Sequence, residues 1–189
     1  MALDLPALHG DALAETERLL TGVGDDQWHL PTPCEDWDVR ELVNHIVSGN
    51  LWVAPLMSGS TVEEVGERLD GDVLGDDPVD AYRCSASEAD AAFRAEGAMD
   101  APANVSYGPV PGRVYAGHRF IDVLVHGWDL AVGAGLDARL RPDLVEACLE
   151  VVLPEAERLA ASGAFGEEHE VPEGASPQTR LLALLGRHG

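Results

Sequence analysis

Residues 114–134 (VYAGHRFIDVLVHGWDLAVGA) constrain the fold of this chain more than any other segment. Their pattern predicts one long helix in which His118, Asp122 and His126 recur at intervals of four residues. Side chains with this spacing share one helix face, and the residues around them are mostly apolar. Helix bundles build ligand and metal sites from polar side chains of this kind on facing helices. We therefore expect an all-helical protein with a polar site inside it.

Further segments carry helical signals. Residues 5–20 have leucines at near-helical spacing, Asp38 and Glu41 form a capping box ahead of an apolar stripe, and Asp77-Pro78 is typical of a helix start. Residues 57–76 are predicted to be an irregular connection with a short helix near Val62, and 104–112 a loop or a short extended piece.

The C-terminal part predicts shorter helices. Pro142 opens one that Pro154 kinks or divides, and residues 176–185 form an amphipathic one. The predicted fold is all-α, a four-helix bundle with short C-terminal helical additions. Residues 1–140 make the bundle, and residues 141–189 make helices that pack on it in the same domain.

Charge and cysteine content exclude several classes of partner and site. The formal net charge is −22, the twelve basic residues are all arginine, and no basic patch occurs, so binding to nucleic acid or to an anionic membrane surface is not expected. Three widely spaced cysteines without a CxxC pair argue against a disulfide framework or a thiolate zinc site. Without a signal-like or membrane-spanning apolar run, we expect a cytoplasmic protein.

The spacing of Asp122 and His126 allows a metal site. A carboxylate and an imidazole one helical turn apart can bind one cation, and His45, in another apolar helix, is the candidate for a third ligand. Spacing alone leaves two other interpretations open. A single histidine on an apolar face is usually a core residue, and an Asp-x-x-x-His pair is often only a helix-surface hydrogen bond.

Other polar and aromatic residues near these motifs have simpler expected roles. Arg113 and Arg119 are candidates for binding a carboxylate of a substrate or cofactor by a bidentate contact. Asp129 is expected to cap the helix or pair with an arginine, and Cys34 to have a structural role. The two tryptophans of the motifs, Trp37 and Trp128, are expected in the core.

Three blocks of sequence resemble one known family. They are TPCEDWDVRELVNHIVSGN (32–50), DVLVHGWDLAVGAG (122–135) and TRLLALLGRHG (179–189). Their order and content are similar to those of the mycothiol-dependent maleylpyruvate isomerase-like proteins of actinobacteria, a metal-binding branch of the DinB/YfiT superfamily. The resemblance covers nearly the whole chain and implies a DinB-like four-helix bundle.

The resemblance also implies a metal site and a chemistry. The metal would be divalent, zinc or alternatively nickel, bound by His45, Asp122 and His126. Other branches carry His or Glu at the position of Asp122, so this shorter residue is expected to lie farther from the metal or to act through water, with His118 as the reserve ligand. Residues that act directly in catalysis are not identified.

The implied reaction is thiol-dependent isomerisation or S-transfer. The metal would activate mycothiol, the small-molecule partner, toward a second, electrophilic substrate. The alternatives are a non-catalytic module that binds a metal or a small molecule, and a tailoring enzyme of secondary metabolism on the same fold. The sequence leaves the existence of a homodimer open.

Overall fold

The computed structural model describes residues 3–156, 158, 166 and 168–188. The chain divides into two compact units, Met1–Asp137 and Ala138–Gly189. Each unit is described by itself, so the predicted packing of the C-terminal helices on the bundle stays a prediction.

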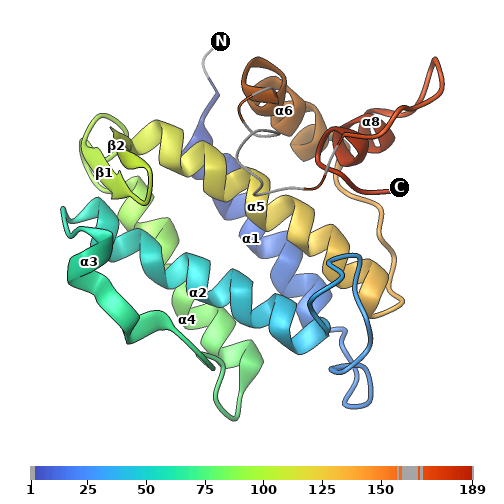
Figure 1. The fold of residues 1–189 in the computed structure, drawn as a ribbon, viewed down its shortest axis with the longest axis horizontal. Coiled ribbons are helices and arrows are strands. Elements are labelled where there is room, and N and C mark those ends of the chain that lie inside the picture. The colour runs from blue at the N-terminus through green and yellow to red at the C-terminus, as the bar shows by residue number, and fades with distance from the viewer. Residues whose placement is uncertain (1–2, 157, 159–165, 167, 189) are drawn as a thin grey trace. The chain divides into compact units, whose positions relative to one another are not determined.

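Four helices make up most of the first unit. They are α1 (Leu5–Leu20), α2 (Val39–Met57), α4 (Pro78–Arg94) and α5 (Gly112–Gly133). Helices α1 and α2 each lie against both α4 and α5, which closes the four into a bundle (Figure 1). The predicted four-helix bundle is therefore confirmed.

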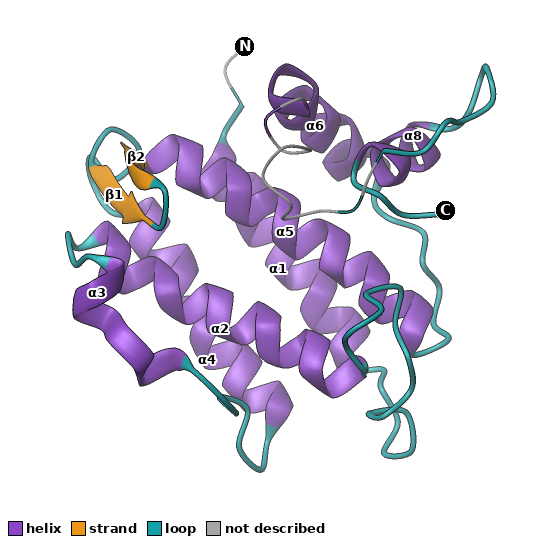
Figure 2. Cartoon of the chain, viewed as in Figure 1, coloured by secondary structure: helices purple, strands orange, loops and turns teal. Residues whose placement is uncertain are grey.

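Short elements fill the connections of this unit. A short helix, α3 (Val62–Val65), runs into the 3₁₀ turn η1 (Gly66–Leu69), where the sequence predicted an irregular connection with a short helix. The antiparallel strands β1 (Pro102–Val105) and β2 (Gly108–Pro111) form a hairpin just before α5 (Figure 2). The piece predicted over 104–112 contains the end of β1, the turn at residues 106–107 and strand β2. Gly108, Pro109 and Pro111, which suggested a loop, lie in β2.

The second unit contains α6 (Pro142–Val152), the 3₁₀ turn η2 (Leu153–Glu155) and α8 (Pro177–Leu184). Helix α6 ends just before Pro154, as predicted, because proline has no N–H to continue the helical hydrogen bonds. Parts of the chain between η2 and α8 lie outside the described residues.

The start of α2 is fixed by the capping box that the sequence predicted. The Asp38 side chain accepts the Glu41 N–H at 2.9 Å, and the Glu41 carboxylate accepts the Asp38 N–H at 2.9 Å. Leu42 and Ile46 then turn into the core, fully buried. This register places His45, two turns into the helix, on the side that approaches α5.

Helix α5 is buried over most of its length, and several side chains in the bundle core around it are polar or charged. The buried polar and charged side chains of the bundle are His9, Thr16, Asn50, Ser85, Arg119, His126 and Asp129. Most of them lie on α2 and α5 or make hydrogen bonds to those helices, so α5 is not a uniformly apolar rod. No helix in the described ranges is long and apolar enough to span a membrane.

Replacing Asp38 with Ala is expected to lower the free energy of unfolding by about 1 kcal/mol, because it removes the side-chain cap of α2. Chemical denaturation followed by circular dichroism measures the change. Glu41→Gln is the control, since glutamine preserves the capping box and should change the free energy by less than about 0.5 kcal/mol. Equal losses in both variants would contradict this account of the helix start.

Candidate metal centre

The three ligands predicted from the sequence come together between α2 and α5. The Oδ1 atom of Asp122 lies 3.6 Å from His45 Nε2 and 3.5 Å from His126 Nε2. These distances are long for hydrogen bonds. Two ligands bound at about 2.1 Å to one tetrahedral zinc would themselves lie about 3.4 Å apart. The three donor atoms are therefore spaced as a shared cation would require.

The Nε2 atom of His45 supports the fit to a metal independently. It is buried and has no hydrogen-bond partner among the described residues, although the ring as a whole is partly exposed. A buried polar nitrogen without a partner costs free energy. A cation held between His45, Asp122 and His126 would give this nitrogen a ligand bond, so the residues present fit a divalent metal.

The two carboxylate oxygens of Asp122 have different partners: one contacts Arg119, and the other faces the two histidines. Its Oδ2 accepts a hydrogen bond from Arg119 Nη1 at 2.8 Å, which leaves Oδ1 directed at the histidines. Burial would raise the pKa of Asp122, but the positive charges of Arg119 and His126 and its contacts with His45 hold that pKa below its usual range. Asp122 therefore stays ionised and offers one oxygen to a metal.

Arg119 is buried inside the bundle and bonded on both sides of the α2–α5 interface. Its side chain is buried, and Nη2 donates to Asn50 Oδ1 at 3.0 Å across the interface with α2. Gly49 makes room for it, because a Cβ atom at that position would collide with the guanidinium group. The predicted contact with a substrate carboxylate has no support here, because the guanidinium is directed at groups of the protein.

Arg113 lies away from this cluster. Arg113 precedes Asp122 by nine residues on α5. It forms an exposed ion pair with Asp100 at 2.7 Å. The structure therefore does not bring Arg113 together with the candidate ligands.

Asp129 contacts His126 at Nδ1, the ring nitrogen that does not face Asp122. His126 Nδ1 lies 2.9 Å from Asp129 Oδ2, and the Cys34 thiol donates to the same oxygen at 3.3 Å. The buried Asp129 carboxylate thus contacts a histidine and a thiol, and its expected pairing with an arginine stays a prediction. A carboxylate on one nitrogen of an imidazole fixes the ring and directs the other nitrogen toward a metal.

Cys34, His126 and Asp129 form a second group with closely spaced donor atoms. Their separations are those of hydrogen bonds, and Cys34 Sγ lies 3.8 Å from His126 Nδ1. We therefore interpret this group as the support of His126, which agrees with the structural role expected for Cys34.

Trp37 is not in the core, contrary to the prediction. It is only half-buried, and its ring stacks on the His45 imidazole with centroids 4.5 Å apart. The apolar face of the indole covers the histidine while one edge stays accessible. Trp128, by contrast, is buried as predicted.

His118, the reserve ligand, is directed elsewhere. Its Nδ1 lies 2.8 Å from the Tyr107 hydroxyl at the tip of the β1–β2 hairpin. Although it lies one turn before Asp122, His118 does not join the cluster, because the hairpin holds its ring.

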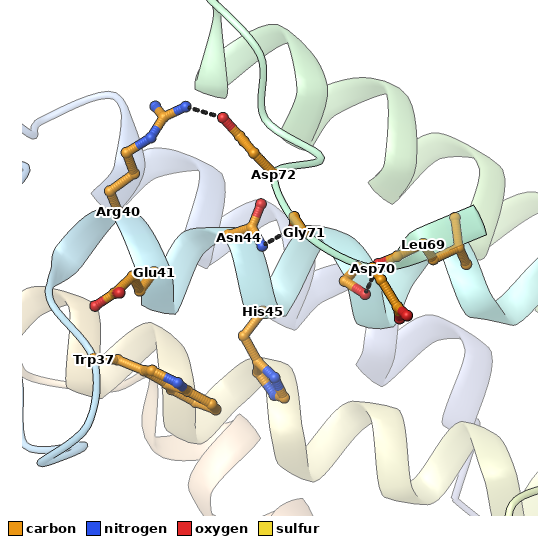
Figure 3. Close-up of a pocket in the computed structure, with 10 residues that line it drawn as sticks. Trp37, Arg40, Glu41, Asn44, His45, Leu69, Asp70, Gly71 and Asp72 are labelled. Carbon is orange, nitrogen blue, oxygen red and sulfur yellow. Dashed lines mark hydrogen bonds and ion pairs between the residues drawn. The ribbon is translucent and has the colours of Figure 1, made fainter. Parts of the chain in front are cut away.

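A pocket of about 630 Å³ adjoins His45 and Trp37. Its walls are α2 and the segment 69–72, which runs alongside that helix; Figure 3 shows the rings of Trp37 and His45 below the α2 ribbon and the Arg40–Asp72 pair above it. The polar lining comprises Arg40, Glu41, Asn44, Ser48, Asp70 and Asp72. Of the three candidate ligands, His45 lines the pocket.

Three side chains on one face of α2 hold the segment 69–72 in place. Arg40 pairs with Asp72 at 2.9 Å, Asn44 donates to the carbonyl of Gly71 at 2.9 Å, and Ser48 donates to the carbonyl of Leu69 at 3.3 Å. The sequence predicted an irregular connection here, and the pocket was not expected. The spacing of four between Arg40, Asn44 and Ser48 is the signal that could have indicated it.

His126 is expected to titrate well above an ordinary histidine in the metal-free protein. Burial opposes its charged form, but the charge of Asp122 and the hydrogen bonds to Asp129 and Cys34 raise the pKa to about 9. The proton should therefore be lost only as the pH rises through about 9. Nuclear magnetic resonance of the ring protons, with a chelator present, measures the pKa.

The variant Asp122→Asn removes the largest of the effects that raise the pKa of His126. That pKa should then fall by at least about one unit. Asp100→Asn, which removes an exposed carboxylate paired with Arg113 at the start of α5, should leave it unchanged. An unshifted pKa in Asp122→Asn would show that the two side chains are not coupled as described.

Comparison with known proteins gives consistent matches. Residues 9–131 match the family described as "Mycothiol maleylpyruvate isomerase N-terminal domain". Two relatives, the uncharacterized proteins MT0763 of Mycobacterium tuberculosis (strain CDC 1551 / Oshkosh) and Rv0738 of Mycobacterium tuberculosis (strain ATCC 25618 / H37Rv), are each 35% identical over 181 residues. These alignments cover 89% of this chain and 90% of each relative.

Two solved structures share the fold. The crystal structure of the mycothiol-dependent maleylpyruvate isomerase matches with a TM-score of 0.64 at 20% sequence identity. A histidine-to-alanine mutant of the same enzyme matches with a TM-score of 0.67 at 19% identity. Both matches cover 86% of this chain and 72% of the solved chain. At these identities the likeness shows a common fold.

Proposed function

Because the chain belongs to the mycothiol maleylpyruvate isomerase N-terminal domain family, we propose that it is a metal-dependent enzyme in which mycothiol reacts with an electrophilic substrate. The resemblance and the DinB-like helical fold expected from the sequence are confirmed by this membership and by the matching structures. The observation that carries the proposal is the spacing of the His45, Asp122 and His126 donor atoms beside an accessible pocket.

The proposed ligand set is that of an open catalytic site. Three protein ligands leave a position for a further group, as in catalytic zinc sites; nickel is the alternative metal. A divalent metal bound there would supply a Lewis acid that stabilises a thiolate at neutral pH. The pocket beside His45 would bring the thiol and the electrophile to this position.

The chain's own residues prepare the site. Arg119 keeps Asp122 ionised and presents Oδ1, while Asp129 fixes the His126 ring. The stacked Trp37 covers His45 and keeps water from one face of it. In this proposal these side chains position the ligands and set their charge.

An external thiol is consistent with the state of the cysteines. Cys148 is buried, which raises its pKa to about 12, and Cys84 is exposed on α4. The Cys34 thiol is hydrogen-bonded to Asp129 behind His126. None of the three lines the pocket, so the sulfur nucleophile would come from the co-substrate.

The proposed reaction is isomerisation or S-transfer. In an isomerisation, the thiolate sulfur bonds to one carbon of a conjugated double bond and the π electrons move onto the adjoining carbonyl group as an enolate. After rotation about the resulting single bond, these electrons re-form the double bond and expel the same thiolate. In an S-transfer the enolate carbon instead takes a proton from water, and the thioether adduct is released. Both begin with the same nucleophilic addition.

Elemental analysis of protein purified without a polyhistidine tag tests the metal site. We expect about one zinc or nickel per chain, and its loss in His45→Ala and in His126→Ala. His118→Ala is the matched control on the same helix and should retain the metal. Retention in all three variants, or no metal in the wild type, would reject this site and favour a non-catalytic small-molecule-binding module.

Asp129→Asn is expected to weaken zinc binding about 10- to 100-fold, because it removes the carboxylate that orients His126. Competition with a chromophoric chelator measures the affinity. Circular dichroism should show an unchanged helical content, since the asparagine can still accept a hydrogen bond from His126. Wild-type affinity in this variant would mean that Asp129 does not position the ligand.

A further inference from the structure

The pocket beside His45 also indicates which electrophile the proposed enzyme accepts. Resting on the proposed function, we infer that this substrate is uncharged, such as an ester, amide or ketone conjugated to a double bond, and that the pocket selects against dicarboxylates. The charges that line the pocket and the way in which the nearby arginines are used support this specificity.

Four arginines of the first unit are already bonded to other groups of the protein. Arg40, the cation that lines the pocket, pairs with Asp72 at 2.9 Å. Arg68 donates to two main-chain carbonyl groups of its own helical turn. Arg119 is buried against Asp122, and the exposed Arg113 pairs with Asp100. A substrate carboxylate in the pocket would have to displace one of these contacts.

The pocket also carries an excess of negative charge. Three carboxylates, those of Glu41, Asp70 and Asp72, line it together with the single guanidinium of Arg40. All three carboxylate residues are exposed. A hydrogen bond to the main chain at Leu74 and the pairing with Arg40 further lower the pKa of Asp72. A dianion entering the pocket would therefore meet like charges.

The remaining lining suits an uncharged molecule. The Trp37 ring and the Leu69 side chain offer apolar surface, whereas the polar groups of Asn44 and Ser48 are engaged in holding the segment 69–72. A neutral molecule can therefore pack against the apolar groups of Trp37 and Leu69 without an ionic partner.

Binding of three matched ligands tests the inference on the full-length, metal-containing protein. Succinate, monomethyl succinate and dimethyl succinate differ in charge but cannot add a thiol. Their binding is followed through the Trp37 indole N–H resonance, which is assigned with Trp37→Phe. We expect the diester to shift this resonance at a concentration at least about tenfold below that needed for succinate. Equal or tighter binding of succinate, or no shift with any ligand, would overturn the inference.

Charge variants of the pocket provide a second test of the selectivity. Glu41→Gln with Asp70→Asn should improve succinate binding about three- to tenfold and leave the diester unchanged, because only the dianion is repelled. The control, Glu88→Gln with Asp25→Asn, removes two exposed carboxylates that do not line the pocket and should alter neither. The same gain in the control would assign the effect to net charge and reject a role of the pocket.

The two proposals fail in different ways. Mycothiol-dependent conversion of dimethyl maleate and of maleate, each divided by its uncatalysed rate, is measured on the same samples. No conversion of either compound together with a selective diester shift would reject the enzymatic function and keep the pocket's selectivity. Faster relative conversion of maleate would reject the selectivity and keep the function.

Discussion

The ion pair between Arg119 and Asp122 is the interaction on which the candidate centre depends. A carboxylate inside a helix bundle needs a compensating charge, since an unpaired buried ion is very costly. Arg119 supplies it at 2.8 Å and, through Asn50, ties α5 to α2. The same contact occupies one carboxylate oxygen and turns the other to His45 and His126. Charge balance, helix packing and ligand orientation thus rest on one guanidinium, for which Gly49 leaves the space.

This arrangement places two histidines in different surroundings although they share one carboxylate. His126 is almost fully buried, with Asp129 behind it, and the negative charges around it favour its protonated form. His45 reaches the cluster from the partly exposed side, where Trp37 covers it. Binding a cation would require His126 to release its proton, so metal affinity and pH are coupled through this residue.

Much of the bundle and the set of candidate ligands could be predicted from the sequence because both depend on local patterns. The capping box at Asp38 and Glu41 sets the start of α2, and the spacing of four between Asp122 and His126 sets their common face. Arg119 was identified but given another role, since its partner Asn50 is 69 residues away in the chain. Trp37 was wrongly expected in the core for the same reason, because tertiary packing decides which side of a residue is covered.

The way in which the segment 69–72 is held has a consequence for how this scaffold diversifies. Asn44 and Ser48 bond its carbonyl oxygens, which every amino acid provides. The side chains of Leu69 and Asp70 can therefore change during evolution without loss of these bonds to α2, and without disturbing ligands that come from α2 and α5, whereas Asp72 is tied to Arg40. Substitutions at Leu69 and Asp70 can change the shape and charge of this pocket wall while the candidate metal ligands stay the same. A family built in this way can acquire new substrates through a few substitutions in one connection.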